Sequence, residues 1–89
     1  MKAVITVTGK DSVGIIAKVA TICSEYNANI VDVTQSILDE YFAMIMLVDI
    51  DRLSVSFAEF SDTLHCFGKE KALEISSMHE DIFNTMHHI

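Results

Sequence analysis

The spacing of apolar residues alternates between two periods along the chain, and this alternation restricts the possible folds more than any other feature. Ala3, Ile5 and Val7 recur at every second position, which is the pattern of a strand with one buried face. Beyond residue 13 the period lengthens, and the apolar residues form one stripe of an amphipathic helix: Ile16, Val19, Ala20, Cys23 and Tyr26. The two patterns predict a first strand followed by a helix that ends near Asn27.

Two further strands follow with almost no connection between them. Residues 29–38 are rich in Ile, Val and Thr, residues 41–50 are nearly all apolar, and only Asp39 and Glu40 separate the two runs. A tight hairpin is therefore predicted at Asp39 and Glu40. In the second of these strands apolar residues occupy both faces, so a helix layer on one face leaves the other in need of cover.

Clear signals mark both ends of a second helix. Ser56 and Glu59 form a capping box, and Val55 and Phe60 are spaced for a hydrophobic staple. Gly68 is expected to close this helix, because glycine readily adopts the left-handed conformation that ends helices.

The end of the chain completes the pattern. Leu73 and Ile75 alternate with polar residues in a short fourth strand, and a second capping box over residues 77–80 predicts a short C-terminal helix. The order is β-α-β-β-α-β. It predicts an α+β, ferredoxin-like sandwich: a four-stranded antiparallel sheet with two helices on one face, plus the short C-terminal helix. We expect a single domain over residues 1–89, with a partner chain on the open face or the edge of the sheet.

Composition and charge indicate which partners the chain is expected to lack and in which compartment it works. The net charge of −7 disfavours binding to nucleic acid and to anionic membranes. The longest uninterrupted apolar run, residues 41–48, is too short to span a bilayer, and residues 1–7 do not resemble a signal peptide. Cys23 and Cys66 form no CxxC pair, which favours free thiols in a reducing cytoplasm.

The sequence shows no residue pattern typical of a catalytic or metal-binding site. Arg52 is the only arginine and lies outside the loop where a small phosphate hydrolase of this fold would need one. His79, His87 and His88 are interpreted as solvated residues near a helix end. Both cysteines fall on or beside apolar helix faces without a spaced histidine to activate them. We therefore expect no catalytic residue, no metal site and no cofactor.

The connection between the first strand and the first helix is the strongest candidate for a binding site. Gly9 and Gly14 bracket Asp11 and Ser12 there. The free backbone N–H groups of the first helical turn suit a carboxylate, and Asp11 suits an ammonium group. The alternative is purely structural: Gly9 forms a turn, Asp11 or Ser12 caps the helix, and Gly14 lets the helix pack closely on the sheet.

The sequence resembles the ACT domain family, whose members are small βαββαβ modules that regulate amino-acid metabolism. The resemblance rests on residues 5–11, on Val13-Gly14-Ile15-Ile16 and on residues 27–32, and it covers nearly the whole chain. The pattern looks most like the ACT domains at the start of formyltetrahydrofolate deformylases and in glycine-cleavage repressor proteins, and it looks closer still to stand-alone ACT proteins of this length.

The resemblance implies a ligand site and a mode of action. ACT domains typically hold a ligand between the loop before the first helix and the second strand, often at a dimer interface. The matching positions in this chain are Gly9, Asp11, Ser12, Gly14, Asn29 and Ile30. The expectation is a homodimeric sensor that binds a small molecule, typically an amino acid, and regulates a partner protein in trans. A protein-protein interaction module that needs no ligand is the alternative.

Overall fold

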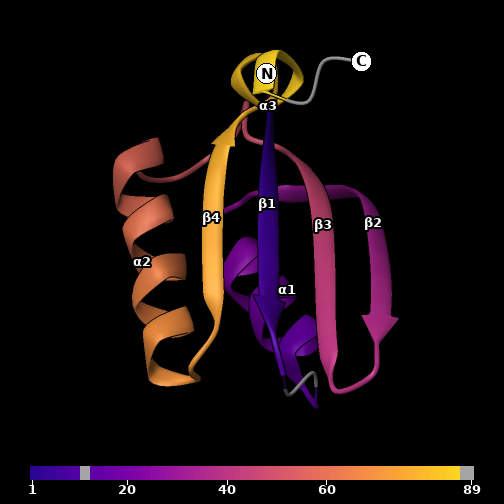
Figure 1. Cartoon of the computed structure of the whole chain (residues 1–89). Helices are drawn as coiled ribbons and strands as arrows, with labels where there is room; N and C mark the ends of the chain where they lie inside the picture. Colours follow the sequence, from indigo (N-terminus) through magenta and orange to yellow (C-terminus); the bar gives the residue numbers. More distant parts are fainter. Residues whose placement is uncertain (11–12, 87–89) are drawn as a thin grey trace.

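The computed structural model describes residues 1–10 and 13–86. Its elements follow one another in the predicted order, with a third helix after the fourth strand (Figure 1). They are β1 (Lys2–Gly9), α1 (Ile15–Glu25), β2 (Asn29–Leu38), β3 (Tyr41–Asp49), α2 (Phe57–Glu70), β4 (Glu74–His79) and α3 (Glu80–Met86). The fold is the ferredoxin-like arrangement that the pattern of periods predicts.

The four strands form one antiparallel sheet in the order β2-β3-β1-β4. β1 lies between β3 and β4, and its register with β3 runs from the Lys2–Asp49 pair to the Gly9–Phe42 pair. The pairing of β2 with β3 shifts register between Ile30 and Asp32, where β2 carries a bulge. β2 and β4 are the two edge strands.

One face of the sheet packs against α1 and α2 and holds the core. The core side chains come from alternate positions of β1, β3 and β4 and from one stripe of each helix; among those fully buried are Ile5, Val7, Val19, Cys23, Met44, Met46, Val48, Phe60 and Leu64. Tyr26 and Phe60 meet edge to face, with ring centroids 6.1 Å apart. Burial of these side chains is the main stabilising contribution in a domain of this size.

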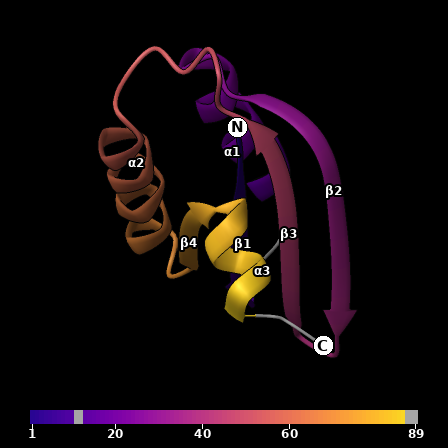
Figure 2. The same cartoon turned by 90° about the horizontal axis from the view of Figure 1, so that it is seen from above.

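The opposite face of the sheet is only partly covered. The short helix α3 contacts β1 and β4 and lies on the other side of the sheet from α1 (Figures 1 and 2). Val4, whose side chain points away from the core, is consequently only 4% exposed. Farther from α3, Tyr41 and Ile45 of β3 remain 50% and 44% exposed. The prediction that β3 presents apolar side chains on both faces is confirmed, and the second face is largely open.

The predicted helix ends are partly correct. The Ser56 hydroxyl accepts a hydrogen bond from the Glu59 N–H at 3.1 Å, as a capping box requires. α2 nevertheless continues through Gly68 to Glu70, so Gly68 does not end it. Gly68 is buried, and a Cβ there would lie 3.0 Å from Ile75 Cγ1, which shows that its role is close packing against β4.

Two capping predictions are wrong. The N-cap of α1 is Gly14, in a left-handed conformation with φ 73° and without a side-chain cap, and not Asp11 or Ser12, which lie outside the described residues. Ser77 does not begin the last helix, because pairing with β1 extends β4 to His79. The Ser77 hydroxyl instead donates to Ser61 Oγ at 2.8 Å.

Candidate functional site

Several segments meet at the end of the sheet where β1 finishes. Gly9 closes β1 and pairs with Phe42 beside the β2–β3 hairpin, and β4 begins on the other side of β1. A Cβ on Gly9 would collide with the buried side chain of Leu73. Gly9 is therefore required for close packing between β1 and the residue that leads into β4. We call this the Gly9 end of the sheet.

The start of α1 lies at the same end, with Gly14 as its N-cap. Among the described residues, apart from the two chain neighbours of Gly14, no atom lies within 4 Å of the position that a Cβ would take, and the Gly14 carbonyl accepts the Lys18 N–H at 3.1 Å. Its φ of 73° is readily adopted by glycine and costs other residues roughly 1 kcal/mol. The first helical turn, which contains no acidic residue, is thus accessible at Gly14.

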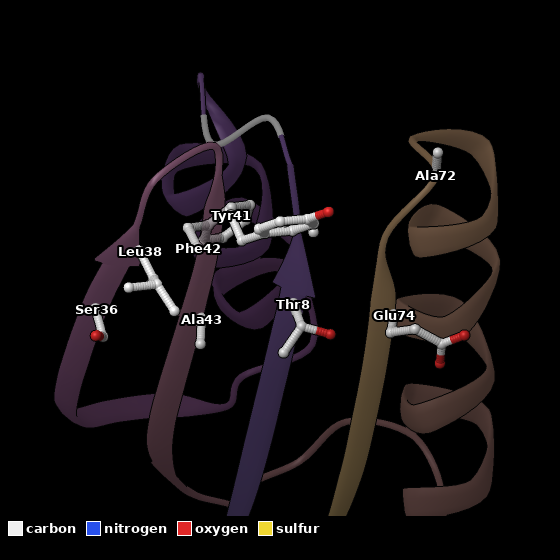
Figure 3. A pocket seen from close by; sticks show the side chains of 9 residues that line it. Thr8, Ser36, Leu38, Tyr41, Phe42, Ala43, Ala72 and Glu74 are labelled. Carbon is white, nitrogen blue, oxygen red and sulfur yellow. The ribbon is translucent and has the colours of Figure 1, made fainter.

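A pocket of about 520 Å³ opens on the uncovered face of the sheet at the Gly9 end (Figure 3). All four strands, or the residues next to them, contribute to its walls: Thr8, Gly9, Ser36, Leu38, Tyr41, Phe42, Ala43, Ala72 and Glu74. Its volume lies within the range of small-molecule sites, and its walls are mainly apolar with a few hydroxyl groups. We call it the open-face pocket.

One charged residue lines the open-face pocket, and a second lies against one of its lining residues. The ammonium of Lys10 lies 5.5 Å from the centroid of the Tyr41 ring, which is close enough for a cation–π contact. Glu74 adds a carboxylate from β4, two strands away from Tyr41. Glu74 therefore lines the pocket itself, whereas Lys10 lies beside it through its contact with Tyr41.

The remaining predicted site residues are elsewhere in the chain. Asn29 pairs with Asp49, which pairs with Lys2 at the start of β1, so Asn29 and Ile30 lie at the opposite end of the sheet from Gly9. Gly9 is seven positions along β1 from Lys2, so the two ends are roughly 23 Å apart. Asn29 borders a separate polar cavity of about 400 Å³ together with Asp49, Asp51 and Arg52. Within one chain, the predicted residues therefore form two groups.

The strand that carries Asn29 is an unprotected edge. In the part of the chain that the structure describes, β2 pairs with β3 alone, and its apolar residues are exposed: Val31 (48%), Val33 (36%), Ile37 (70%) and Leu38 (78%). Its ten residues include one charge, Asp32, and no proline. Exposed edges of this length and composition readily pair with another strand.

The cysteines and His79 differ in their surroundings. Burial raises the pKa of the Cys23 thiol to about 11, so its thiolate is scarce at neutral pH and it is not a nucleophile. Cys66 is exposed and adjoins Phe67, which packs on the core, so it lies beside the apolar face of α2 and not on it. His79 is half-buried in β4 and stacks on Phe57 at 4.5 Å, so it is not a solvated helix-end residue. His87 and His88 lie outside the described residues.

Residues 1–10 and 13–86 contain no group of three His, Cys, Asp or Glu side chains that could hold a metal ion. None of the helices in this part of the chain is long and apolar enough to cross a membrane.

Comparison with known proteins defines the family. The family model described as the ACT domain matches residues 2–77. The chain belongs to the ACT domain family. This agrees with the prediction that it is a regulatory and not a catalytic domain.

Close relatives of this ACT protein are of the same length. A UPF0237 protein of Clostridium perfringens is 48% identical over 89 residues, which cover 100% of both chains. A UPF0237 protein of Methanocaldococcus jannaschii is 44% identical and covers 99% of this chain and 98% of its own.

Solved structures confirm the ACT fold. An ACT domain protein from Streptococcus pneumoniae superposes with a TM-score of 0.81 at 38% identity, and the match covers 93% of each chain. A formyltetrahydrofolate deformylase from Pseudomonas syringae has a TM-score of 0.78 at 20% identity, over 88% of this chain and 27% of the deformylase. A putative glycine cleavage system transcriptional repressor has a TM-score of 0.70 at 24% identity, over 86% of this chain and 44% of the repressor. The last two likenesses concern the fold alone.

Most of the open-face pocket was not foreseen among the site residues. Thr8, Ser36, Leu38, Tyr41, Ala43 and Glu74 lie on the uncovered face of the sheet. The signal was present in β3, whose second apolar face indicates a surface that the helices do not cover. What the sequence pattern does not show is that hairpin and strand ends shape that surface into a pocket.

Proposed function

We propose that this ACT domain is a cytoplasmic, homodimeric sensor that binds an amino acid or a similar small carboxylate and regulates a separate protein. The observation that carries the proposal is the open-face pocket, with its apolar walls, with Glu74 in its lining and with Lys10 against the ring of Tyr41, which also lines it. The ligand's carboxylate faces Lys10, its ammonium faces Glu74, and its apolar part lies against Tyr41 and Ala43.

Dimerisation through β2 connects the two groups of predicted site residues. Two β2 strands that pair edge to edge in a two-fold symmetric dimer run antiparallel, so the start of one lies beside the end of the other. The partner subunit's Asn29 then lies next to Leu38, which lines the pocket at its β2 side. Asn29 shares a register pair with Asp49, on the same face of the sheet as Tyr41, so its amide faces the pocket.

In this arrangement Gly9 and Gly14 come from one subunit, and Asn29 and Ile30 come from the other. The first turn of α1, which Gly14 leaves accessible, is at the same end and is a second donor of N–H groups to a carboxylate. Asp11 and Ser12 belong to the same proposed site, although they lie outside the described residues.

A thermal-shift screen of the purified protein against the common amino acids tests the proposal. A ligand at a hundred times its Kd raises the free energy of unfolding by about 2.7 kcal/mol, which shifts the melting temperature by several degrees. Tyr41→Ala should lose the shift, whereas Ile82→Ala, a matched change of an exposed apolar residue on α3, should keep it. A flat screen for the unchanged protein contradicts small-ligand sensing by amino acids.

The exposed apolar surface favours a second candidate function, a protein-protein interaction module that needs no ligand. Leu38, Tyr41 and Ile45 are exposed on the open face, and Ile82 and Met86 are exposed on α3. Apolar residues gathered in this way often mark a binding surface for a protein. Stoichiometric capture of one partner with no metabolite present, together with a flat ligand screen, supports this second function.

A further inference from the structure

The face of the domain opposite the open-face pocket carries a groove between α1 and α2. The two helices cover the same side of the sheet but stand apart from each other (Figures 1 and 2). Two adjoining cavities of about 430 and 370 Å³ lie along them and share the side chains of Ile22, Phe67 and Glu70. Ile22 and Phe67 are partly buried and pack on the core, so they form a firm apolar floor.

The rim of this groove is acidic over most of its length. Glu59, Asp62 and Glu70 of α2 line it on one side, and Glu25 of α1 lines it on the other. All four are exposed, and none of their carboxylates forms a salt bridge within the described ranges 1–10 and 13–86. These carboxylates are therefore available to a cationic partner.

The positive charges of the groove are confined to one end. Lys18 of α1 and Lys71 after α2 border the cavity near the Gly9 end, whereas the cavity with Asp62 has no cationic residue in its lining. The groove thus has a strongly acidic half and a mixed half.

We propose that this groove docks a basic amphipathic helix of the protein that the domain regulates. An apolar floor with acidic rims complements a helix that presents Leu-like residues on one face and Lys or Arg along its flanks. The proposal rests on the regulatory part of the proposed function and not on the identity of the ligand. The groove lies away from the β2 edge and from the open-face pocket, so dimerisation and ligand binding leave it free.

A synthetic peptide tests the groove directly. The probe is a fluorescein-labelled peptide of 18 residues, about five helical turns, with leucines at the i, i+3, i+4 and i+7 positions of one face and lysines on the flanks. Fluorescence anisotropy with the full chain should show a Kd below about 100 µM that weakens as NaCl is raised from about 0.05 to 0.5 M. A peptide of the same composition, with the leucines scattered around the helix, should bind more weakly.

Charge reversal on the acidic rim tests whether the amphipathic peptide binds in the groove. The double variant Asp62→Lys/Glu70→Lys should weaken binding of the amphipathic peptide about tenfold or more. The matched control Asp39→Lys/Glu40→Lys makes the same change of net charge at the exposed hairpin and should leave binding nearly unchanged. Thermal unfolding of each variant verifies that the fold is intact.

Three results would overturn the inference: no binding below about 100 µM, equal binding of the scattered peptide, or equal weakening by the hairpin control. The last two would show that the protein attracts cations through its overall charge alone. None of these results depends on an amino acid in the open-face pocket, so failure here leaves the proposed ligand site untouched.

Discussion

Asn29 and Gly9 lie at opposite ends of the same sheet, because Asn29 pairs through Asp49 with the start of β1 and Gly9 is the last residue of β1. A site that includes both residues therefore needs two subunits. Antiparallel pairing of two β2 edges meets that need, because it brings the start of one β2 to the Gly9 end of the other subunit. The dimer is thus part of the ligand site in this account.

Placing charges on the β2 edge should separate the dimer. Val33 and Ile37 are 36% and 70% exposed on this strand, and lysines at both positions disfavour strand pairing by desolvation and by repulsion across the two-fold axis. We expect Val33→Lys/Ile37→Lys to be a folded monomer by analytical ultracentrifugation. The control Ile82→Lys, on α3, should have the same oligomeric state as the unchanged protein. A variant that remains dimeric excludes the β2 edge as the interface.

A side chain at Gly14 should block access to the first turn of α1. Gly14→Asn keeps the left-handed conformation at low cost, because asparagine adopts it more readily than most residues. No described atom beyond the two chain neighbours lies within 4 Å of the Cβ that the Asn side chain adds. We expect binding of the amino acid found by the thermal-shift screen to be lost while the melting temperature without ligand changes little. Persistent binding removes Gly14 from the site.

Much of the fold could be predicted from the sequence, because both apolar periods and the Ser56 cap act locally. The fourth strand could not be placed correctly in this way. Pairing with β1 extends β4 over Ser77, and a ladder of strand hydrogen bonds outweighs a local capping signal. Gly14 was not identified as the N-cap of α1 from the sequence, because the spacing of apolar residues does not reveal a positive φ.

The separation of the predicted site residues into two groups could have been predicted from the topology of the sheet. A β-α-β crossover makes β1 and β2 parallel, so the start of β2 must lie far from the end of β1. Residues 9–14 and Asn29 can therefore share one site only if they come from two chains. The open-face pocket was harder to foresee, since it depends on where α3 stops covering the sheet and on how Tyr41 and Glu74 lie on the open face.

Loss of the Ser56 cap should weaken α2. Ser56→Ala leaves the Glu59 N–H without its 3.1 Å acceptor, which should lower the free energy of unfolding by about 1 kcal/mol in urea titrations. Ser54→Ala, a change of the same size at an exposed position outside the helix, is the control and should have a smaller effect. Equal effects of the two changes would contradict a stabilising role of the cap.

The buried thiol of Cys23 should make stability depend on alkaline pH. Its pKa is raised from 9.0 to about 11 by burial, so the folded state holds the proton more tightly than the unfolded state does. This contribution is fully present below pH 9 and is lost as the pH rises towards 11. The difference in unfolding free energy between the unchanged protein and Cys23→Ala should therefore shrink over that window.

Thiol labelling provides an independent test of the same burial. In the native protein at neutral pH, a disulfide reagent should modify the exposed Cys66 quickly and Cys23 only on unfolding. The variant Cys66→Ala should then show no rapid labelling. Fast modification of Cys23 in the folded state would contradict its burial.

Mixing two inactive variants shows whether the ligand site is shared between two subunits. Tyr41→Ala removes a wall of the pocket, and Asn29→Ala removes the residue that the partner is proposed to supply, so neither homodimer should bind the amino acid. After subunits are exchanged in an equal mixture, titration calorimetry should recover about a quarter of the sites, because half of the dimers are mixed and each has one intact site. Absence of any recovered binding in a mixture shown to contain mixed dimers would contradict a ligand site shared between two subunits.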